Sequence, residues 1–383
     1  MDRTLPPLGL YIHLPWCERK CPYCDFNSHE LSELPEQDYI DQLLRDLDRE
    51  VEELGRNHAR EVATLFIGGG TPSLFSAGAI ARLMSGIRDR VQLADDLEAT
   101  MEANPGSAEA LKFSGFREAG VNRLSIGVQS FSNAQLNALG RIHNADAALA
   151  AIDAARVAGF ESFNVDLMHG LPSQDTALAA SDLEQAMSSG APHISWYQLT
   201  LEPNTVFYKQ PPTLPGENLL ADIQDRGESL LAGAGFNQYE VSAYARPGFE
   251  CRHNRNYWEF GDYLGIGAGA HGKMTTEDGT VVRYSKTRMP ENYLAADGFE
   301  RTALRQVQPA ELPGEFMMNA LRLNAGFSLA LYRERTGRPL SQIEAPLSAL
   351  VDGGLLSRDA DIVSATPLGR RFLDSLITEF LPG

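Results

Sequence analysis

Residues 9–29 read GLYIHLPWCERKCPYCDFNSH and contain three of the four cysteines of the chain. Cys17, Cys21 and Cys24 follow the spacing C-x3-C-x2-C. Three thiolates this close together can bind one face of an iron–sulfur cube, which leaves the fourth iron without a protein ligand. An iron of that kind can bind a small molecule, as an open zinc site binds water. The apolar residues 8–14 predict a first strand that leads into this cysteine loop.

Two other uses of these cysteines are weaker hypotheses. A structural zinc site would need His13 or His29 as its fourth ligand, and zinc-binding loops usually contain C-x2-C pairs. A disulfide framework would need a second group of cysteines and an exported chain, and the sequence indicates neither. Iron content and visible absorption would separate zinc from a cluster.

The composition is that of an ordinary globular protein, with 43% hydrophobic and 22% charged residues among 383. The formal net charge of −18 argues against sequence-independent binding to nucleic acid or anionic lipid, because both need a basic surface. No stretch approaches the roughly 20 apolar residues of a membrane span. The N-terminal residues lack the features of a secretion signal. We therefore expect a cytoplasmic protein that does not bind nucleic acid.

Strand and helix patterns alternate over the first part of the chain. Apolar, β-prone runs predict six strands, and helical segments follow them. This order predicts a parallel sheet, but six units are fewer than the eight of a closed barrel. We predict an α/β fold, a partial, open (β/α)6 barrel over residues 1–237, with its chemistry at the carboxyl ends of the strands. The predicted strands cover residues 8–14, 62–67, 97–102, 121–128, 163–167 and 193–201.

The pattern changes after residue 237. Residues 238–309 are predicted to form an extension with a strand at 239–244, an aromatic and glycine-rich stretch, and a hairpin at Asp278-Gly279. Residues 310–383 are predicted to form a small domain of helices with a short hairpin, like a winged helix. That fold often binds DNA, but no basic recognition helix is evident here, so packing against the barrel is the better interpretation.

Polar and glycine residues lie at or just after successive predicted strand ends. Residues 68–72 read GGGTP after the second strand, where glycine lets the backbone approach a ligand closely. Glu102, Gln129 and Asp166 end the third, fourth and fifth strands, and Arg141 follows the fourth. A carboxylate can bind hydroxyl or amino groups, and arginine can bind a carboxylate with two parallel hydrogen bonds. Together they predict a polar ligand site at one end of the barrel.

The chain resembles the radical SAM superfamily, whose members bind S-adenosylmethionine (SAM) at an iron–sulfur cluster. It is most similar to the branch that contains oxygen-independent coproporphyrinogen III oxidases, and within it to their relatives, the HemW-type heme chaperones. The resemblance extends over nearly the whole chain. It lies in the segments YIHLPWCERKCPYCDFNSH, LFIGGGTPSLF, TMEANPG, GVNRLSIGVQSF, LGRIH, FNVDLMHGLP, SWYQLTLEPNT and CRHNRNYW.

This resemblance assigns expected roles to individual residues. Cys17, Cys21 and Cys24 are implied to bind a 4Fe-4S cluster. Gly70 and Thr71 match positions that contact a second SAM molecule in the oxidase. The positions implied to contact the SAM on the cluster are Tyr11, Tyr23, Gly69, Glu102, Gln129, Arg141 and Asp166.

The sequence departs from the oxidase pattern in two places. The oxidase motif continues to a further cysteine, and Phe26 stands at that position here. The oxidase also has a long segment before its first strand, whereas Tyr11 is reached almost at once here. Both differences argue against decarboxylase activity.

Residues 253–258 read HNRNYW, which matches the HNxxYW motif associated with heme in the chaperone family. The imidazole of His253 is a suitable heme ligand, and its aromatic neighbours can stack on a porphyrin. The thiolate of Cys251 is an alternative ligand. Without the resemblance, a hydrogen-bonded turn histidine would be the simpler interpretation of His253.

Two functions follow as expectations. In the first, the protein binds heme and delivers it to heme-accepting proteins such as membrane respiratory enzymes, while the cluster and SAM serve structure or regulation. In the second, it is an enzyme that decarboxylates two propionates of coproporphyrinogen III through a 5′-deoxyadenosyl radical. The sequence leaves open the acceptor, the heme stoichiometry, whether SAM is cleaved, and the oligomeric state, a homodimer included.

Overall fold

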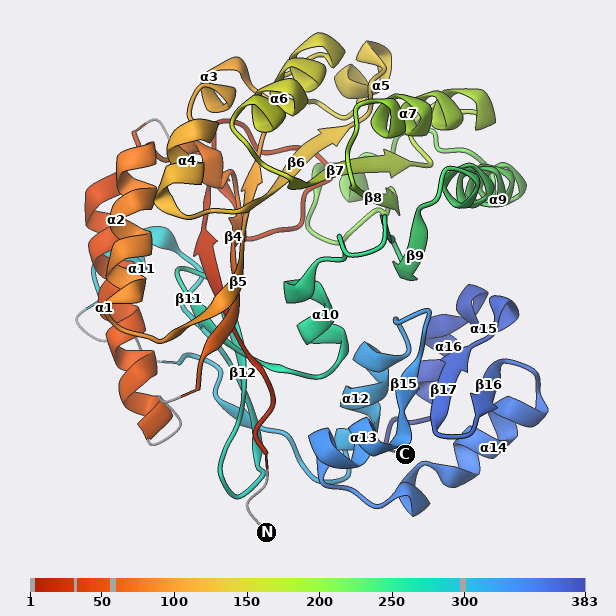
Figure 1. Cartoon of the computed structure of the whole chain (residues 1–383). Coiled ribbons are helices and arrows are strands. Elements are labelled where there is room, and N and C mark those ends of the chain that lie inside the picture. The colour runs from red at the N-terminus through yellow and green to blue at the C-terminus, as the bar shows by residue number, and fades with distance from the viewer. Residues whose placement is uncertain (1–3, 31–32, 56–59, 297–300, 383) are drawn as a thin grey trace.

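The computed structural model describes residues 4–30, 33–55, 60–296 and 301–382. Its centre is a twelve-stranded sheet in the order β14-β13-β12-β11-β1-β4-β5-β6-β7-β8-β10-β9 (Figure 1). β1 pairs with β11 and β8 pairs with β10, so the sheet does not close on itself. The open (β/α)6 arrangement is therefore confirmed. Its parallel strands are β1 (Leu8–Leu14), β4 (Val62–Gly69), β5 (Leu93–Ala103), β6 (Arg123–Gln129), β7 (Ser162–His169) and β8 (His193–Gln198).

Side chains alternate between the two faces of each strand, and helices cover the outer face. On β4, Leu65 and Ile67 are buried in the apolar core shared with the helices, whereas Thr64, Phe66 and Gly68 face the barrel interior. No helix in the described part of the chain is long and apolar enough to span a bilayer. The outer helices are α1 (Glu36–Leu54), α2 (Ala77–Arg88), α3 (Ser107–Ala110), α4 (Phe113–Ala119), α5 (Asn133–Ala138), α6 (Ala145–Val157), α7 (Thr176–Ser188) and α9 (Glu217–Gly233).

The extension adds strands to both edges of the same sheet. β11 (Asp262–Ile266) lies parallel to β1, and β12 (His271–Thr275) and β13 (Val281–Ser285) form the hairpin predicted around Asp278-Gly279. The single strand predicted at 239–244 is instead a pair, β9 (Asn237–Glu240) and β10 (Ala243–Ala245). β14 (Arg305–Gln306) ends the other edge. The domain boundaries after residues 237 and 309 stay predictions.

One short helix, α10 (Arg252–Trp258), lies inside the open barrel (Figure 1). The carboxylate of Glu98 on β5 accepts hydrogen bonds from the backbone N–H groups of Arg252 and His253, at 3.1 and 3.0 Å. An acidic group at this end of a helix satisfies N–H groups that have no partner within the helix. α10 therefore fills the interior below the carboxyl ends of the strands.

The C-terminal domain has its own apolar core, which includes Phe316, Tyr332 and Val363. Its three-stranded sheet and its helices form the expected winged-helix-like unit. The strands are β15 (Phe327–Ser328), β16 (Leu356–Asp359) and β17 (Ile362–Ala365). The helices are α12 (Leu312–Ala320), α13 (Leu329–Thr336), α14 (Glu344–Asp352), α15 (Pro367–Arg371) and α16 (Leu373–Thr378).

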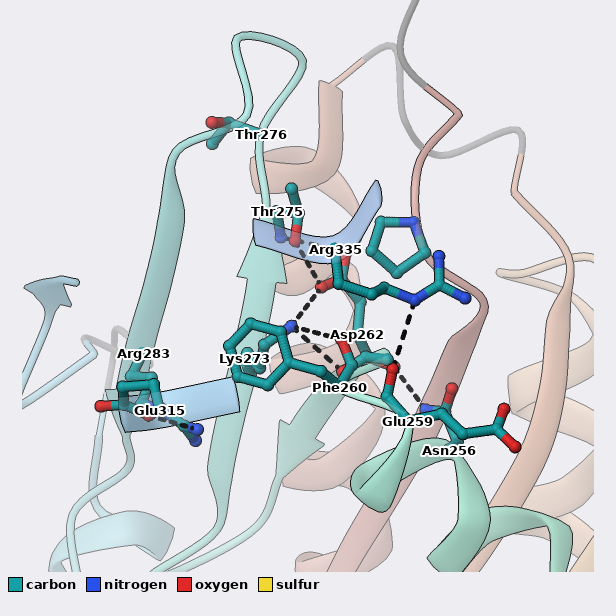
Figure 2. Close-up of polar contacts among 12 residues, drawn as sticks. Asn256, Glu259, Phe260, Asp262, Lys273, Thr275, Thr276, Arg283, Glu315 and Arg335 are labelled. Atoms are coloured by element: carbon teal, nitrogen blue, oxygen red, sulfur yellow. Dashed lines mark hydrogen bonds and ion pairs between the residues drawn. The ribbon is translucent and has the colours of Figure 1, made fainter. Parts of the chain in front are cut away.

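Polar contacts join this domain to the segment that follows α10 (Figure 2). Arg335 donates to the carbonyl of Glu259 at 3.3 Å, and Arg283 pairs with Glu315 at 2.7 Å. Beside them the buried ammonium of Lys273 contacts Asp262 at 3.1 Å, and burial lowers the pKa of this lysine to about 8. These contacts hold the C-terminal domain against the part of the chain that follows α10.

Candidate cluster and cofactor site

The three predicted cluster ligands lie on one loop after β1, between the short strands β2 (Trp16–Cys17) and β3 (His29–Glu30). Their thiols are partly buried, and none is in a disulfide. Thr71 donates to the sulfur of Cys17 at 3.4 Å, and Arg141 donates to the sulfur of Cys21 at 3.4 Å. Burial raises the pKa of Cys17 and Cys24. Because metals bind thiolates, cluster binding at these cysteines must release protons.

A cavity of about 240 Å³ lies between the cysteine loop and the carboxyl ends of the strands. It brings together all the predicted site residues except Tyr11 and His253. The predicted residues in its wall are Cys17, Cys21, Tyr23, Cys24, Gly69, Gly70, Thr71, Glu102, Gln129, Arg141 and Asp166.

At the end of β4, neighbouring groups lie too close to the backbone of Gly69 and Gly70 for a side chain to fit. The backbone of Gly69 has φ +118°, a conformation that L side chains rarely adopt, and its N–H donates to the Glu102 carboxylate at 3.0 Å. A Cβ on Gly70 would lie 2.5 Å from the carbonyl oxygen of Trp16. Side chains here would push the cysteine loop away from β4.

Two carboxyl groups line the same cavity. Burial, and then the nearby Asp166, raise the pKa of Glu102 to about 7. Burial also raises the pKa of Asp166, which accepts hydrogen bonds from Ser125 at 3.0 Å and Asn164 at 2.7 Å. A cationic ligand would favour the ionised form of both groups, because an opposite charge nearby lowers a carboxyl pKa. The pair suits a ligand with ammonium or sulfonium character.

Arg141 and Gln129 complete the wall. Arg141 donates to Asn104 at 2.8 Å and to the carbonyl of Gly127 at 2.9 Å, and its buried Nε has no partner among the described residues. Gln129 has φ 69° and accepts from the Tyr197 hydroxyl at 2.7 Å. Tyr197 was not predicted as a site residue, although it lies near the end of β8, where a strand-end position again faces the cavity.

A second cavity of about 570 Å³ adjoins the first. The two share Phe26, Gly69 and Glu102, and Tyr11 lines the second one. Among its other wall residues, Asp25, Asn27, Tyr263, Gly269, His271, Ser285 and Arg288 carried no expected role from the sequence. The wall consists of Tyr11, His13, Asp25, Phe26, Asn27, Gly69, Glu102, Tyr257, Tyr263, Gly269, His271, Ser285 and Arg288.

Comparison with known proteins decides the family. Residues 11–180 match the Radical SAM superfamily, and residues 307–372 match the HemN C-terminal domain. The chain is 50% identical over 378 residues to "Heme chaperone HemW" of Escherichia coli, covering 98% of this chain and 99% of that protein. It is 48% identical over 379 residues to the protein of the same name from Haemophilus influenzae, covering 98% of each. The chain belongs to the HemW family of radical SAM proteins.

The solved structure of coproporphyrinogen III oxidase HemN from Escherichia coli supports the fold of this HemW-family chain. Its TM-score is 0.83 at 22% identity, and the match covers 98% of this chain and 90% of that chain. The likeness extends through both the open barrel and the C-terminal domain, which confirms the expected architecture.

Membership of the radical SAM superfamily implies a 4Fe-4S cluster and SAM, and the first cavity fits them. Three free thiols lie in its wall, the donor set that such a cluster needs. The unpartnered Nε of Arg141 is available to an anionic group, and Glu102 and Asp166 are available to a cationic one. SAM carries both kinds of group, because it has a carboxylate as well as an ammonium and a sulfonium group.

The zinc hypothesis needs His13 or His29 as the fourth ligand beside the three cysteines, and His13 is already held by other contacts. His13 has both ring nitrogens engaged, with the Tyr11 hydroxyl at 3.0 Å and the carbonyl of Asn27 at 2.9 Å. Burial lowers its pKa to about 4.

The structure does not bring His253 to either cavity. It is 1% exposed, and its ring nitrogens contact Thr64 at 2.9 Å and the Tyr257 hydroxyl at 2.8 Å. Burial lowers the pKa of His253 to about 3 and raises that of Cys251 to about 11. The Cys251 thiol lies 3.6 Å from Glu98 and is also 1% exposed. Both groups, in this arrangement, belong to the packing of α10.

Proposed function

We propose that this protein is a heme chaperone, which binds heme and transfers it to heme-requiring proteins. The observation that carries the proposal is the identity of 50% and 48%, over 98% of the chain, with proteins named heme chaperone HemW. Delivery to membrane respiratory enzymes, a cytoplasmic location and a homodimeric state are the finer parts of the same proposal.

In this proposal the first cavity holds the cluster and SAM. Cys17, Cys21 and Cys24 would hold the cluster, which when bound offers one open iron and can carry single electrons. The residues of this cavity that would contact SAM are Tyr23, Gly69, Glu102, Gln129, Arg141 and Asp166, with Gly70 and Thr71 next to them, while Tyr11 would reach SAM from the adjoining second cavity. Glu102 and Asp166 would bind its cationic groups, and Arg141 its carboxylate, because these side chains share one cavity wall.

The second cavity supports the heme part of the proposal. Its volume of about 570 Å³ lies within the roughly 300–1,000 Å³ of typical cofactor pockets. Three tyrosines and Phe26 line it, and aromatic rings provide the flat apolar contacts that a porphyrin needs. His253 supports this cavity through its hydrogen bond to Tyr257.

The alternative function is oxygen-independent coproporphyrinogen III oxidation. It is less well supported, because the likeness to HemN is one of fold at 22% identity and Phe26 stands where the oxidase motif has cysteine. Phe26 is 60% exposed and lines both cavities. Its ring would put an apolar surface beside the cluster instead of a fourth thiol.

One experiment separates the two functions. Anaerobically reconstituted protein is loaded with heme, mixed with an apo-cytochrome, and in parallel incubated with coproporphyrinogen III, SAM and a reductant. We expect heme to appear in the acceptor and coproporphyrinogen to stay unconverted. Multiple-turnover formation of protoporphyrinogen without heme transfer would replace the chaperone function with the enzyme.

A further inference from the structure

A single histidine in the wall of the second cavity is free to bind a ligand. His271 begins β12, is exposed, and makes no hydrogen bond through its ring to any residue that the structure describes. His13 and His253 each have both ring nitrogens engaged. A ring nitrogen must have a free lone pair to bind iron, so His271 meets a condition that the other two do not.

An arginine lies beside this histidine. His271 pairs with Ser285 in the β12–β13 hairpin, and the N–H of Gly269 donates to the carbonyl of Thr287 at 2.7 Å, so Arg288 follows directly. The guanidinium of Arg288 has no ion pair within the described part of the chain, and it lines the same cavity. An arginine of this kind suits a carboxylate, which it can bind with two hydrogen bonds.

Aromatic groups form much of the remaining wall. The rings of Tyr257 and Tyr263 meet edge to face, with their centroids 4.5 Å apart, and both line the cavity with Tyr11. Phe26 lies at the rim, with 60% of its surface exposed. A flat macrocycle bound in this cavity would cover the ring of Phe26.

We propose that heme binds in the second cavity, with His271 as the ligand of its iron and Arg288 paired with one of its propionates. This assignment rests on the proposed function, since it locates the heme of that function. It also replaces His253 and Cys251 as candidate ligands. The heme iron calls for a nitrogen ligand and the propionates call for a cation, and the wall of this cavity contains one of each in His271 and Arg288.

The charge state of His271 agrees with this role. Burial, then Arg288 and Arg283, lower its pKa from the ordinary value. The imidazole is therefore mostly neutral at pH 7, as an iron ligand must be.

The test is a hemin titration of the full-length, cluster-reconstituted protein, followed by its visible and electron paramagnetic resonance spectra. We expect His271→Ala to bind hemin at least tenfold more weakly, with a changed Soret band, and to keep its iron, sulfide and melting temperature. His253→Gln, which can keep the hydrogen bonds to Thr64 and Tyr257, should show the wild-type spectrum. Added imidazole should restore that spectrum in His271→Gly, because it can occupy the vacated ligand position.

The Arg288 assignment is tested with a change in the ligand. Arg288→Ala should weaken binding of hemin several-fold but leave binding of hemin dimethyl ester unchanged, because the ester has no propionate charge. Equal weakening for both porphyrins would overturn this pairing.

The outcomes distinguish the inference from the function. A His271→Ala protein with the wild-type spectrum and affinity overturns the inference, while heme transfer by the same preparation would leave the chaperone function standing. A spectrum lost in His253→Gln but kept in His271→Ala would assign the ligand to α10. Wild-type protein that binds no hemin overturns both.

Discussion

Glu102 lies in the wall of both cavities, and it is the titratable residue that the two walls share. Burial raises its pKa to about 7, so its carboxyl group is about half protonated in the ligand-free protein at neutral pH. A cationic ligand binds to the ionised form. Binding should therefore become stronger as the pH rises through this pKa, and the reverse should hold as the pH falls.

We expect SAM affinity of the reconstituted protein to increase between about pH 6 and pH 8, the interval around this pKa. Glu102→Gln should remove most of that increase and weaken binding at pH 8 by roughly 1–3 kcal/mol, the value of a hydrogen bond to a charged group. Titration calorimetry at several pH values measures both. An identical pH slope in Glu102→Gln would assign the titration to another group.

The cysteines are tested by metal content. Cys17, Cys21 and Cys24 are the thiols in the wall of the first cavity, so each single alanine variant should lose most of its iron and sulfide on anaerobic purification. Cys251→Ala is the matched control, because that thiol is buried beside Glu98, away from the cavity. A full complement of four irons in Cys21→Ala would contradict this ligand set.

At the scale of elements, α10 is stabilised almost entirely by its surroundings. Glu98 accepts a hydrogen bond from the backbone N–H of His253 at the start of the helix. The ring of His253 hydrogen-bonds to Thr64 on β4 and stacks on Phe66, with the ring centroids 5.3 Å apart. A helix of seven residues would not be stable alone. The sequence could not reveal it, because residues 251–260 have no apolar stripe of helical period.

His253→Ala should lower the free energy of unfolding by about 2–4 kcal/mol, because it leaves a cavity and two buried partners without hydrogen bonds. His253→Gln should cost less than half as much, since an amide can both donate and accept. Urea unfolding of the ligand-free protein measures the difference. Equal stability of the wild type and His253→Ala would show that α10 does not depend on this side chain.

Periodic elements were predictable, and single polar contacts were not. The six strands are found in their predicted places, and the strand-end rule placed Glu102, Gln129 and Asp166 in one cavity. His271 carried no signal in the sequence, because it is an isolated histidine among glycines. Only the pairing of β12 with β13 brings it next to Arg288. The motif around His253 was visible, but burial of its ring depends on contacts with a strand nearly two hundred residues away.

At the scale of the whole molecule, α10 connects the cavities to the C-terminal domain. Tyr257, near its end, lines the second cavity, and Arg322 lies over the ring of the neighbouring Trp258, 4.4 Å from its centroid. Arg335 also reaches the carbonyl of Glu259 (Figure 2). Residues of one short helix thus contact a ligand cavity and a second domain, so both should respond to changes in the helix.

The cysteine loop and the second cavity are joined by Asn27. Its side-chain amide donates to the carbonyls of Ala268 and Arg288, at 3.0 and 2.8 Å, and its own carbonyl accepts from His13 at 2.9 Å. The loop that carries the cluster ligands therefore holds the two segments that flank His271. Cluster and heme sites should be coupled through this side chain, although they occupy different cavities.

Asn27→Ala should keep the iron and sulfide content of the wild type, because no cysteine changes, but should release heme faster. Loss of its hydrogen bonds to the carbonyls of Ala268 and Arg288, at about 1 kcal/mol each, predicts a dissociation rate higher by up to roughly 30-fold. Stopped-flow transfer of heme to apomyoglobin measures this rate. The control is Asn144→Ala, which removes the same side chain from the N-cap of α6, where it accepts from Ala147 at 2.9 Å, away from both cavities. A rate equal in Asn27→Ala and wild type would show that the cluster loop does not restrain the heme cavity. Loss of iron together with heme would mean that Asn27 supports the cluster first.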